Sequence, residues 1–418
     1  MSKPKVITLG CRLNTFESEV MREIGDDAGL DDAIIINTCA VTAEAERQAR
    51  QTIRRTKRDN PDARIIVTGC AAQLNAGAFA AMAEVDRVLG NEEKLDPAIL
   101  NGGGAPVEVA DIMTVKETAP PVISGLEGRT RAFVQIQQGC DHRCTYCIIP
   151  FARGPNRAVT PAAIIAQVRG LVDAGYLEVV LTGVDICSYG ADITGTPNLA
   201  GLISEILAAV PDLARLRLST LDPAVVDDAL VRLLASEERL MPHLHLSLQA
   251  MDDVVLKRMK RRHARQDGFD VVARARAVRP DTVFGADLIA GFPTETRSMF
   301  ENTLAAVGEL DLAYLHVFPY SPRPGTPAAR MPQVDAKARK DRAGRLRTAG
   351  DAGLKRFLES RTGTTAQVLV EKDGDGQSRG LSQHYASVRL DFSAPIGAIV
   401  DAQVTAAGDD YLIASKAA

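Results

Sequence analysis

Three cysteines lie within eight residues in the segment GCDHRCTYCIIP, which runs from Gly139 to Pro150. One short loop with this spacing can place Cys140, Cys144 and Cys147 at three corners of an iron–sulfur cubane. The segment supplies no fourth cysteine. An open coordination position separates a catalytic metal from a structural one, because substrate or cofactor binds there. The spacing therefore predicts a metal centre whose remaining position takes a small molecule.

A zinc site is the alternative for this loop, and it would need a fourth protein ligand. His142 is the nearest candidate, but its place between the cysteines predicts that its ring does not turn inward. A disulfide framework is not expected, because seven cysteines are too few for a chain of 418 residues and are odd in number. We therefore favour an iron–sulfur centre.

Three more cysteines end apolar runs near the start of the chain: KVITLGC, AIIINTC and ARIIVTGC. The runs lie about thirty residues apart with helix-like stretches between them, which is typical of a parallel βαβ sheet. Carboxyl ends of parallel strands meet at one edge, so Cys11, Cys39 and Cys70 are expected to converge there. A buried structural cysteine is the alternative for any one of them. Three at equivalent strand ends favour a second metal site.

Six β-rich runs separated by amphipathic segments predict a partial or complete (β/α) barrel between about residues 128 and 325. They are RAFVQIQ, LEVVLTGVD, RLRLST, HLHLSLQ, TVFGADLIAGFP and AYLHVFPYS. Helix starts are expected at Thr160-Pro161 and Asp222-Pro223, where the first residue caps and the proline takes the first turn. The fold class is therefore α/β.

One of these runs, HLHLSLQ, predicts a polar lumen. Its period of two places His243, His245, Ser247 and Gln249 on the face opposite three leucines. A filled barrel has branched apolar side chains inside, so a polar inner row indicates an open cavity for a ligand. The two histidines are expected to be hydrogen-bonded core residues rather than metal ligands.

Three domains are predicted: residues 1–105, residues 126–358 including a trailing basic helix, and residues 361–418. A Gly/Pro-rich segment at 101–122 is expected to connect the first two. The last segment contains short alternating strands with Gly and Asp turns, which predict a small β-barrel.

Composition and charge predict a cytoplasmic protein with no membrane association. No stretch approaches the roughly 20 apolar residues that span a bilayer, and no apolar leader precedes the first strand. The net charge of −4 argues against general nucleic-acid coating but allows a local basic surface. Basic residues gather at 54–58, 257–265 and 337–356, although most such runs are solvated helix faces.

The CxxxCxxC loop, with Tyr146 before its last cysteine, resembles the radical S-adenosylmethionine signature. The whole chain is similar to the methylthiotransferases of that superfamily. Their N-terminal domain carries cysteines that match Cys11, Cys39 and Cys70, and their C-terminal β-barrel is the nucleic-acid-binding TRAM domain. GCRLNTFES, NTCAVT and HVFPYSPRPGTPA most resemble the branch that modifies N6-threonylcarbamoyladenosine beside the tRNA anticodon.

The resemblance implies two [4Fe-4S] clusters and S-adenosyl-L-methionine as cofactors. The cofactor's amino and carboxylate groups would complete the cluster on Cys140, Cys144 and Cys147, and its cleavage would yield a radical that abstracts the hydrogen on carbon 2 of adenine. The other cluster would carry the sulfur that is methylated and inserted. The implied partners are the tRNA anticodon stem-loop and an external one-electron donor of the flavodoxin or ferredoxin type.

Supporting site residues are also expected. Tyr146, Gln249, Asp287 and Gly291 are candidate cofactor contacts, with structural roles as the alternative for Gln249 and Asp287. Gly291 in ADLIAGFPTET permits close backbone approach, and Thr294 can cap the next helix. Arg153 and Arg157 are candidates for phosphate or substrate carboxylate, with surface arginines as the alternative. Cys187 matches no expected ligand and is interpreted as a bystander thiol.

Three features depart from the family pattern. The tail from Arg361 carries more acidic than basic residues, which is unusual for a module that meets phosphates. Contacts would then rest on a few placed residues or on the preceding basic helix, which contains Lys337, Arg339, Lys340, Arg342, Arg345 and Arg347. The segments LSTLDP and SLQAMDD also depart from the family pattern.

Other functions remain open from the sequence. The same chemistry on isopentenyladenosine of tRNA or on an aspartate of a ribosomal protein is the nearest alternative. A two-cluster electron-transfer protein is the alternative from another class, although it needs neither a polar cavity nor an appended β-barrel.

Overall fold

A computed structural model describes residues 4–30, 32–117, 122–374 and 376–417. Its N-terminal unit is a sheet of parallel strands in chain order, as predicted. The strands are β1 (Lys5–Thr8), β2 (Ala33–Thr38), β3 (Arg64–Gly69), β4 (Arg87–Leu89) and β5 (Val107–Glu108). The helices are α1 (Arg12–Asp27), α2 (Ala43–Asp59), α3 (Cys70–Leu74), α4 (Ala76–Ala80) and α5 (Pro97–Leu100). The predicted connecting segment partly joins this sheet as β5, and its residues 118–121 lie outside the described part.

The central strands are buried because helices cover the sheet on both faces. Every residue of β2 is buried, and so are all residues of β3 after Arg64. This explains why AIIINT and RIIVTG are nearly continuous apolar runs rather than alternating ones.

The central unit is a partial (β/α) barrel made of two parallel sheets, β6-β9-β10 and β11-β12-β13-β14. Only Ser219 separates β10 from β11, so the chain passes directly from the first sheet into the second. Among the described residues no pairing joins β6 to β14, so the barrel stays open there. The strands are β6 (Arg131–Gln135), β9 (Glu178–Thr182), β10 (Arg215–Leu218), β11 (Thr220–Leu221), β12 (His243–Gln249), β13 (Val283–Ala290) and β14 (Tyr314–Pro319).

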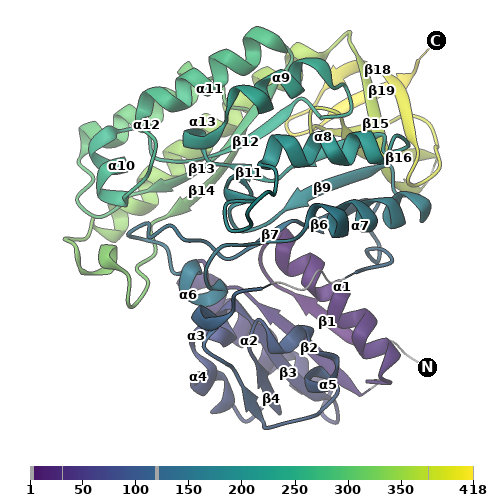
Figure 1. Cartoon of the computed structure of the whole chain (residues 1–418). Coiled ribbons are helices and arrows are strands. Elements are labelled where there is room, and N and C mark those ends of the chain that lie inside the picture. Colours follow the sequence, from purple (N-terminus) through teal and green to yellow (C-terminus); the bar gives the residue numbers. More distant parts are fainter. Residues whose placement is uncertain (1–3, 31, 118–121, 375, 418) are drawn as a thin grey trace.

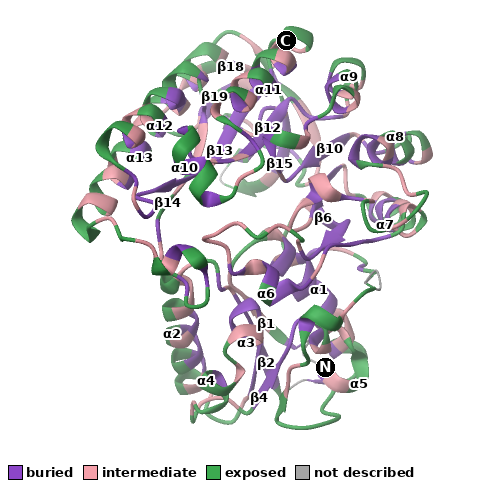
Figure 2. Ribbon diagram, turned by 60° about the vertical axis from the view of Figure 1, so that its left-hand side comes forward, coloured by how far each residue is buried: buried purple, intermediate pink, exposed green. Residues whose placement is uncertain are grey.

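Helices surround these strands on the outside, and Figure 2 shows buried strands beneath largely exposed helix faces. They are α7 (Pro161–Asp173), α8 (Leu199–Ala209), α9 (Asp228–Ser236), α10 (Asp253–Met259), α11 (Arg265–Val278) and α12 (Arg297–Glu309). Both proline-marked starts are present: Asp222 caps a turn by accepting from the Ala224 amide, whereas Thr160 precedes Pro161 without a side-chain cap. Single turns lie at η1 (Glu93–Leu95), η2 (Ile112–Thr114), η3 (Ile186–Ser188), η4 (Pro223–Val225) and η5 (Pro327–Arg330).

The long helix α13 (Ala336–Arg361) leads to a closed five-stranded barrel, so the predicted small β-barrel is confirmed. Its strands are β15 (Thr365–Gly374), β16 (Gln377–Ser382), β17 (Ser387–Leu390), β18 (Ile399–Ala407) and β19 (Leu412–Lys416). Leu358 of α13 belongs to the core of this barrel, which ties the helix to it. The domain boundaries expected from the sequence stay a prediction.

A buried charge network docks the C-terminal barrel against the central unit. Glu178 of β9 pairs with Arg217 at 2.6 Å and with Arg215 at 3.5 Å. Both arginines also donate to main-chain carbonyl oxygens of the C-terminal barrel, at Gln367, Leu381, Ser382 and Gln383. The single carboxylate thus holds the cations that bind the two units together.

Tyr385 of the C-terminal barrel fills one end of the polar lumen. Its ring stacks on His243 with centroids 4.8 Å apart and lies within 6 Å of the guanidinium groups of Arg12, Arg131 and Arg217. Arg12 also donates to its hydroxyl at 3.2 Å. The expected open cavity is therefore closed at the end of the barrel where β6 and β12 begin.

The described part of the chain contains no helix with the length and apolar character needed to span a bilayer.

Replacing Glu178 by Gln should lower the free energy of unfolding by about 3–5 kcal/mol, because two buried arginines lose their counter-charge. Chemical denaturation measures this loss. Glu237→Gln is the matched control, since Glu237 pairs with a partly exposed arginine at 2.9 Å and should cost less than about 1 kcal/mol. Equal losses in the two variants would contradict the assigned role of Glu178.

Candidate functional site

Cys11, Cys39 and Cys70 follow three neighbouring strands at one edge of the N-terminal sheet. Cys11 precedes α1, Cys39 follows β2, and Cys70 begins α3. The structure brings them together, because each thiol of Cys11 and Cys39 interacts electrostatically with the other and with Cys70. Burial raises the pKa of the Cys39 thiol to about 11, so metal binding here would release protons.

Glycines allow this convergence, and the sequence analysis did not use them. A Cβ added to Gly10, whose φ is +111°, would lie 2.9 Å from the Cβ of Cys39 and 3.2 Å from its sulfur. One added to Gly69 would lie 2.4 Å from the carbonyl oxygen of Thr38. The signal in the sequence was a Gly-Cys pair, which recurs at Gly139-Cys140.

The second cysteine trio lies in a loop that the strands β7 (Gln137–Gln138) and β8 (Arg157–Ala158) close at its base. The amide of Cys147 donates to the carbonyl of Cys144 at 3.0 Å. Burial raises the pKa of the Cys140 and Cys147 thiols to about 12. The loop therefore presents neutral thiols whose deprotonation a metal would have to drive.

His142 does not lie as expected. Its Nε2 is 3.0 Å from Asp185, and the ligand atoms of Cys140, His142 and Asp185 lie within 4.8 Å of one another. The prediction that its ring stays away from the cysteine site is therefore wrong, because Asp185 draws it inward. Asp185 itself was missed, although its place three residues after the end of β9, at the ligand-binding edge, was a signal for it.

Arg261 also lies beside this loop, and the sequence did not single it out as a site residue. Its Nη1 lies 3.8 Å from the sulfur of Cys144, and its Nη2 donates to the Ser247 carbonyl at 2.8 Å. Asp222 pairs with it at 3.3 Å. The cluster KRMKRRHAR therefore contributes at least one internal cation rather than only a solvated face.

A cavity of about 230 Å³ lies beside the second cysteine trio, where Cys147 lines it. Tyr146, Cys147, Gln249 and Asp287 line it from the barrel, and Thr42 lines it from the segment after Cys39. Three of the four predicted cofactor contacts thus share one cavity. Gln249 adopts a left-handed φ of +62° beside a register shift between β12 and β13. Strained backbone of this kind concentrates at functional sites.

Asp287 is held in place by two histidines. It accepts from His245 Nε2 at 3.0 Å and from His316 Nδ1 at 3.1 Å. Burial alone would raise the pKa of Asp287, but these hydrogen bonds outweigh it and hold the pKa well below the usual range. His245 is therefore a hydrogen-bonded residue, as predicted. The same prediction is wrong for the ring of His243, which is buried with no partner for Nε2 among the described residues. Burial lowers the pKa of His243 well below the usual value, so it is neutral.

Gly291 and Thr294 differ from expectation. Gly291 is not among the residues lining the cavity, and a Cβ on it would lie 2.4 Å from the side chain of Arg339 in α13. Its close approach therefore serves helix packing. Thr296, not Thr294, caps α12 by accepting from the Met299 amide, because Thr294 lies two residues too early at a φ of +67°.

Arg153 was predicted to meet substrate, and that prediction is wrong. The side chain is buried, and it donates to Cys70, Glu17, Gln138 and Asn14 inside the protein. Arg157 is buried as well, with Nη1 donating to the carbonyl oxygens of Arg153 and Pro155. Arg153 therefore joins the two units, whereas the predicted role of Arg157 stays a prediction.

Cys187 lies apart from both trios. Its sulfur accepts from the Asp222 amide at 3.3 Å, and burial raises its thiol pKa to about 12. The position suits a structural thiol.

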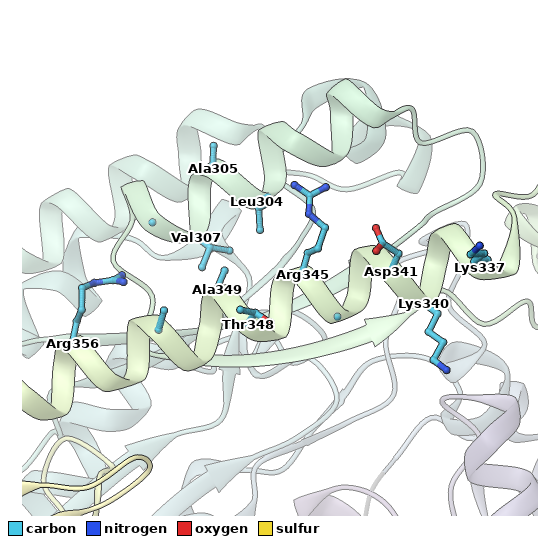
Figure 3. A pocket seen from close by; sticks show the side chains of 13 residues that line it. Leu304, Ala305, Val307, Lys337, Lys340, Asp341, Arg345, Thr348, Ala349 and Arg356 are labelled. Carbon is cyan, nitrogen blue, oxygen red and sulfur yellow. The ribbon is translucent and has the colours of Figure 1, made fainter.

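A larger groove of about 1,120 Å³ runs between α12 and α13 on the outside of the barrel (Figure 3). Most arginines of the basic helix are engaged within the protein: Arg342 with Glu295, Arg345 with Glu301, and Arg356 with Asp311. Lys337 and Lys340 are exposed near the end of α13 that approaches the cavity, where Arg339 donates to Tyr320. The sequence therefore overstated the charge available on this helix.

Two family descriptions match the chain. Residues 134–307 match the radical SAM superfamily, and residues 3–90 match the uncharacterized protein family UPF0004. A solved radical S-adenosylmethionine methyltransferase, TsrM from Kitasatospora setae, shares the fold with a TM-score of 0.57 at 16% identity. The match covers 79% of this chain and 77% of that one.

Curated relatives match almost the whole chain. It is 48% identical to a threonylcarbamoyladenosine tRNA methylthiotransferase MtaB of Rickettsia prowazekii, over 98% of this chain and 96% of that protein. It is 34% identical to a protein of the same description in Bacillus subtilis, over 97% and 94%. A tRNA-2-methylthio-N(6)-dimethylallyladenosine synthase of Erythrobacter litoralis is 35% identical over 98% and 96%.

Proposed function

This chain belongs to the radical S-adenosylmethionine tRNA methylthiotransferases, and we propose that it adds a methylthio group to carbon 2 of N6-threonylcarbamoyladenosine beside the tRNA anticodon. It is a transferase. The observation that carries the proposal is the cavity lined both by Cys147 and by Thr42, three residues after Cys39. A base held there would lie against Cys147 on one side and against the segment that follows Cys39 on the other.

The radical SAM family uses S-adenosylmethionine with a [4Fe-4S] cluster, and we propose that Cys140, Cys144 and Cys147 hold that cluster. A second cluster is proposed on Cys11, Cys39 and Cys70. Two features of the chain fit it: the space that a Cβ on Gly10 would fill, and the buried guanidinium of Arg153 at 3.2 Å from the Cys70 sulfur. A thiolate-bound cluster is anionic, so a buried cation beside it lowers the cost of burying its charge.

Bound together, the cluster and S-adenosylmethionine supply the radical hydrogen abstraction that acid/base chemistry cannot perform on an aromatic C–H. The protein's share is positioning. Tyr146 and Gln249 form the cavity wall, and Asp287, fixed by its two histidines, offers an ionised acceptor for a polar substrate or cofactor group. Packing of α3 against α6 (Ile149–Arg153) shields the site from one side (Figure 1).

A cationic row on the C-terminal barrel supports tRNA as the partner. Lys372, Arg379 and Arg389 are register neighbours across β15, β16 and β17, and all three are exposed. Arg389 also lies 3.5 Å from the ring centroid of Tyr411. The acidic barrel therefore has a local surface that suits phosphates. We propose that the anticodon stem contacts this row.

We further propose that the stem runs along α13 to the cavity. The helix is about 39 Å long at 1.5 Å per residue. It links the barrel core at Leu358 to the cavity rim at Tyr320. Electrons for cofactor cleavage would come from a flavodoxin- or ferredoxin-type donor.

Cells lacking this protein should lose 2-methylthio-N6-threonylcarbamoyladenosine while retaining other methylthio nucleosides, as measured by nucleoside mass spectrometry. Wild-type protein should restore the nucleoside, whereas Cys144→Ala and Cys39→Ala should not. In vitro, Cys144→Ala should abolish S-adenosylmethionine cleavage and Cys39→Ala should spare it. Loss of the methylthio derivative of isopentenyladenosine instead would identify that nucleoside as the substrate. An unchanged nucleoside profile would contradict a tRNA substrate.

Gly10→Ala should prevent Cys11 from approaching Cys39, because the new Cβ would contact the Cys39 side chain. Anaerobic iron analysis should then fall from about eight irons per chain to about four, as expected for two cubanes reduced to one. Gly29→Ala is the control, since Gly29 also has a positive φ but nothing within 4 Å of an added Cβ. Iron near eight in Gly10→Ala would argue against the second cluster.

The triple variant Lys372→Ala, Arg379→Ala, Arg389→Ala should weaken tRNA binding and flatten its salt dependence. Each lost phosphate contact reduces the slope of log K against log salt by about 0.7–0.9, so a decrease of about 2–3 is expected. Filter binding across a salt series measures it. The exposed Lys5, at the amino end of β1, provides the control variant Lys5→Ala. An unchanged slope in the triple variant would exclude the cationic row from the tRNA contact.

A further inference from the structure

We infer that Arg153 is a positioning residue that raises the reduction potential of the cluster proposed on Cys11, Cys39 and Cys70. The inference rests on the proposed function. The hydrogen bond from Arg153 Nε to the Cys70 sulfur, at 3.2 Å, carries it. Hydrogen bonds to cluster sulfurs are among the main means by which a protein sets such potentials.

The guanidinium has no freedom to turn elsewhere. Its Nη1 donates to Glu17 and to Gln138 Oε1 at 3.0 Å, and its Nη2 donates to Asn14 Oδ1 at 2.6 Å and Glu17 Oε2 at 3.0 Å. With both Nη atoms committed, Nε is left to face Cys70. The side chain is only 2% exposed, so water does not compete for this donor.

The charges around Arg153 point the same way. Glu17 forms ion pairs with both Arg153 and the buried Lys94, whose Nζ lies 2.6 Å from Glu17 Oε2. Lys94 also donates to Asn91 Oδ1 at 2.8 Å, which adds no charge. One carboxylate therefore faces two cations among the described contacts. A cluster bound through Cys70 would bring the missing negative charge, since buried charges need partners.

Arg153 also reaches Cys70 from the other unit. It ends α6, directly after the loop of the second cysteine trio, while Cys70 begins α3 of the N-terminal unit. The hydrogen bond therefore joins the two proposed cluster sites. A positive donor stabilises the more negative, reduced state of a cluster, so its loss must lower the potential.

The experiment uses the full chain with Cys140, Cys144 and Cys147 replaced by Ala, so that iron reports on the remaining trio alone. Each protein is loaded anaerobically and titrated potentiometrically, with the reduced cluster followed by electron paramagnetic resonance. Arg153→Gln should shift the midpoint to more negative potential. It should also remove an exchangeable proton coupling seen by electron–nuclear double resonance in H₂O but not D₂O.

Two further variants separate the hydrogen bond from charge and from stability. Lys94→Gln removes one positive charge from the same carboxylate but no donor to sulfur, so its shift should be smaller and the proton coupling should remain. Arg153→Lys keeps the charge beside Glu17 and should give an intermediate potential. If thermal unfolding shows that Arg153→Gln does not fold, the potential of Arg153→Lys tests the inference in its place.

The outcomes are distinct. If Arg153→Gln has the same midpoint potential as the parent, the inference is overturned while the proposed function stays intact. If Arg153→Gln does not fold, the same comparison is made between Arg153→Lys and the parent. A shift in Lys94→Gln as large as that in the Arg153 variant, with the coupling unchanged, would do the same. A parent protein that binds no iron would overturn both the second cluster and this inference.

Discussion

The buried pair between Glu17 and Arg153 is the contact on which the site depends. Glu17 comes from α1 of the N-terminal unit and Arg153 from the end of α6 beside the second cysteine loop. The pKa of Glu17 is lowered to about 2 because Arg153 and Lys94 outweigh the effect of its burial. A carboxylate so buried stays charged only beside such cations, so the pair fixes where the two units meet.

The same principle docks the C-terminal barrel. Glu178 forms ion pairs with Arg215 and Arg217, and both arginines also donate hydrogen bonds to main-chain carbonyls of the barrel. The ring of Tyr385 then closes the end of the lumen. The proposed tRNA surface is thus joined to the central unit by buried hydrogen bonds, and α13 sets the span between that surface and the cavity. Each junction has one fully buried carboxylate that faces more than one cation, which makes each sensitive to loss of that carboxylate.

Much of the fold and the candidate site was predictable. Apolar β-rich runs separated by helix-like stretches, the placement of Gly and Pro, and cysteines at strand ends indicated the parallel sheet, the barrel strands and the cysteine trios. Tyr146, Gln249 and Asp287 were each predicted as cofactor contacts, and one cavity is lined by all three. Arg153 was misjudged because an arginine after a metal loop has the same local sequence whether it faces solvent or a buried glutamate.

The sequence by itself determined the chemistry available to this protein. It fixes which thiols are present, which strands they follow, and that each group has three cysteines rather than four. Only the tertiary structure decided which cations are free and which are committed, because pairing depends on residues more than a hundred positions apart, as with Glu17 and Arg153. It also decided that Gly291 serves α13 and that Tyr385 closes the lumen. Local patterns specify elements, whereas charge burial and close approach are settled where the elements meet.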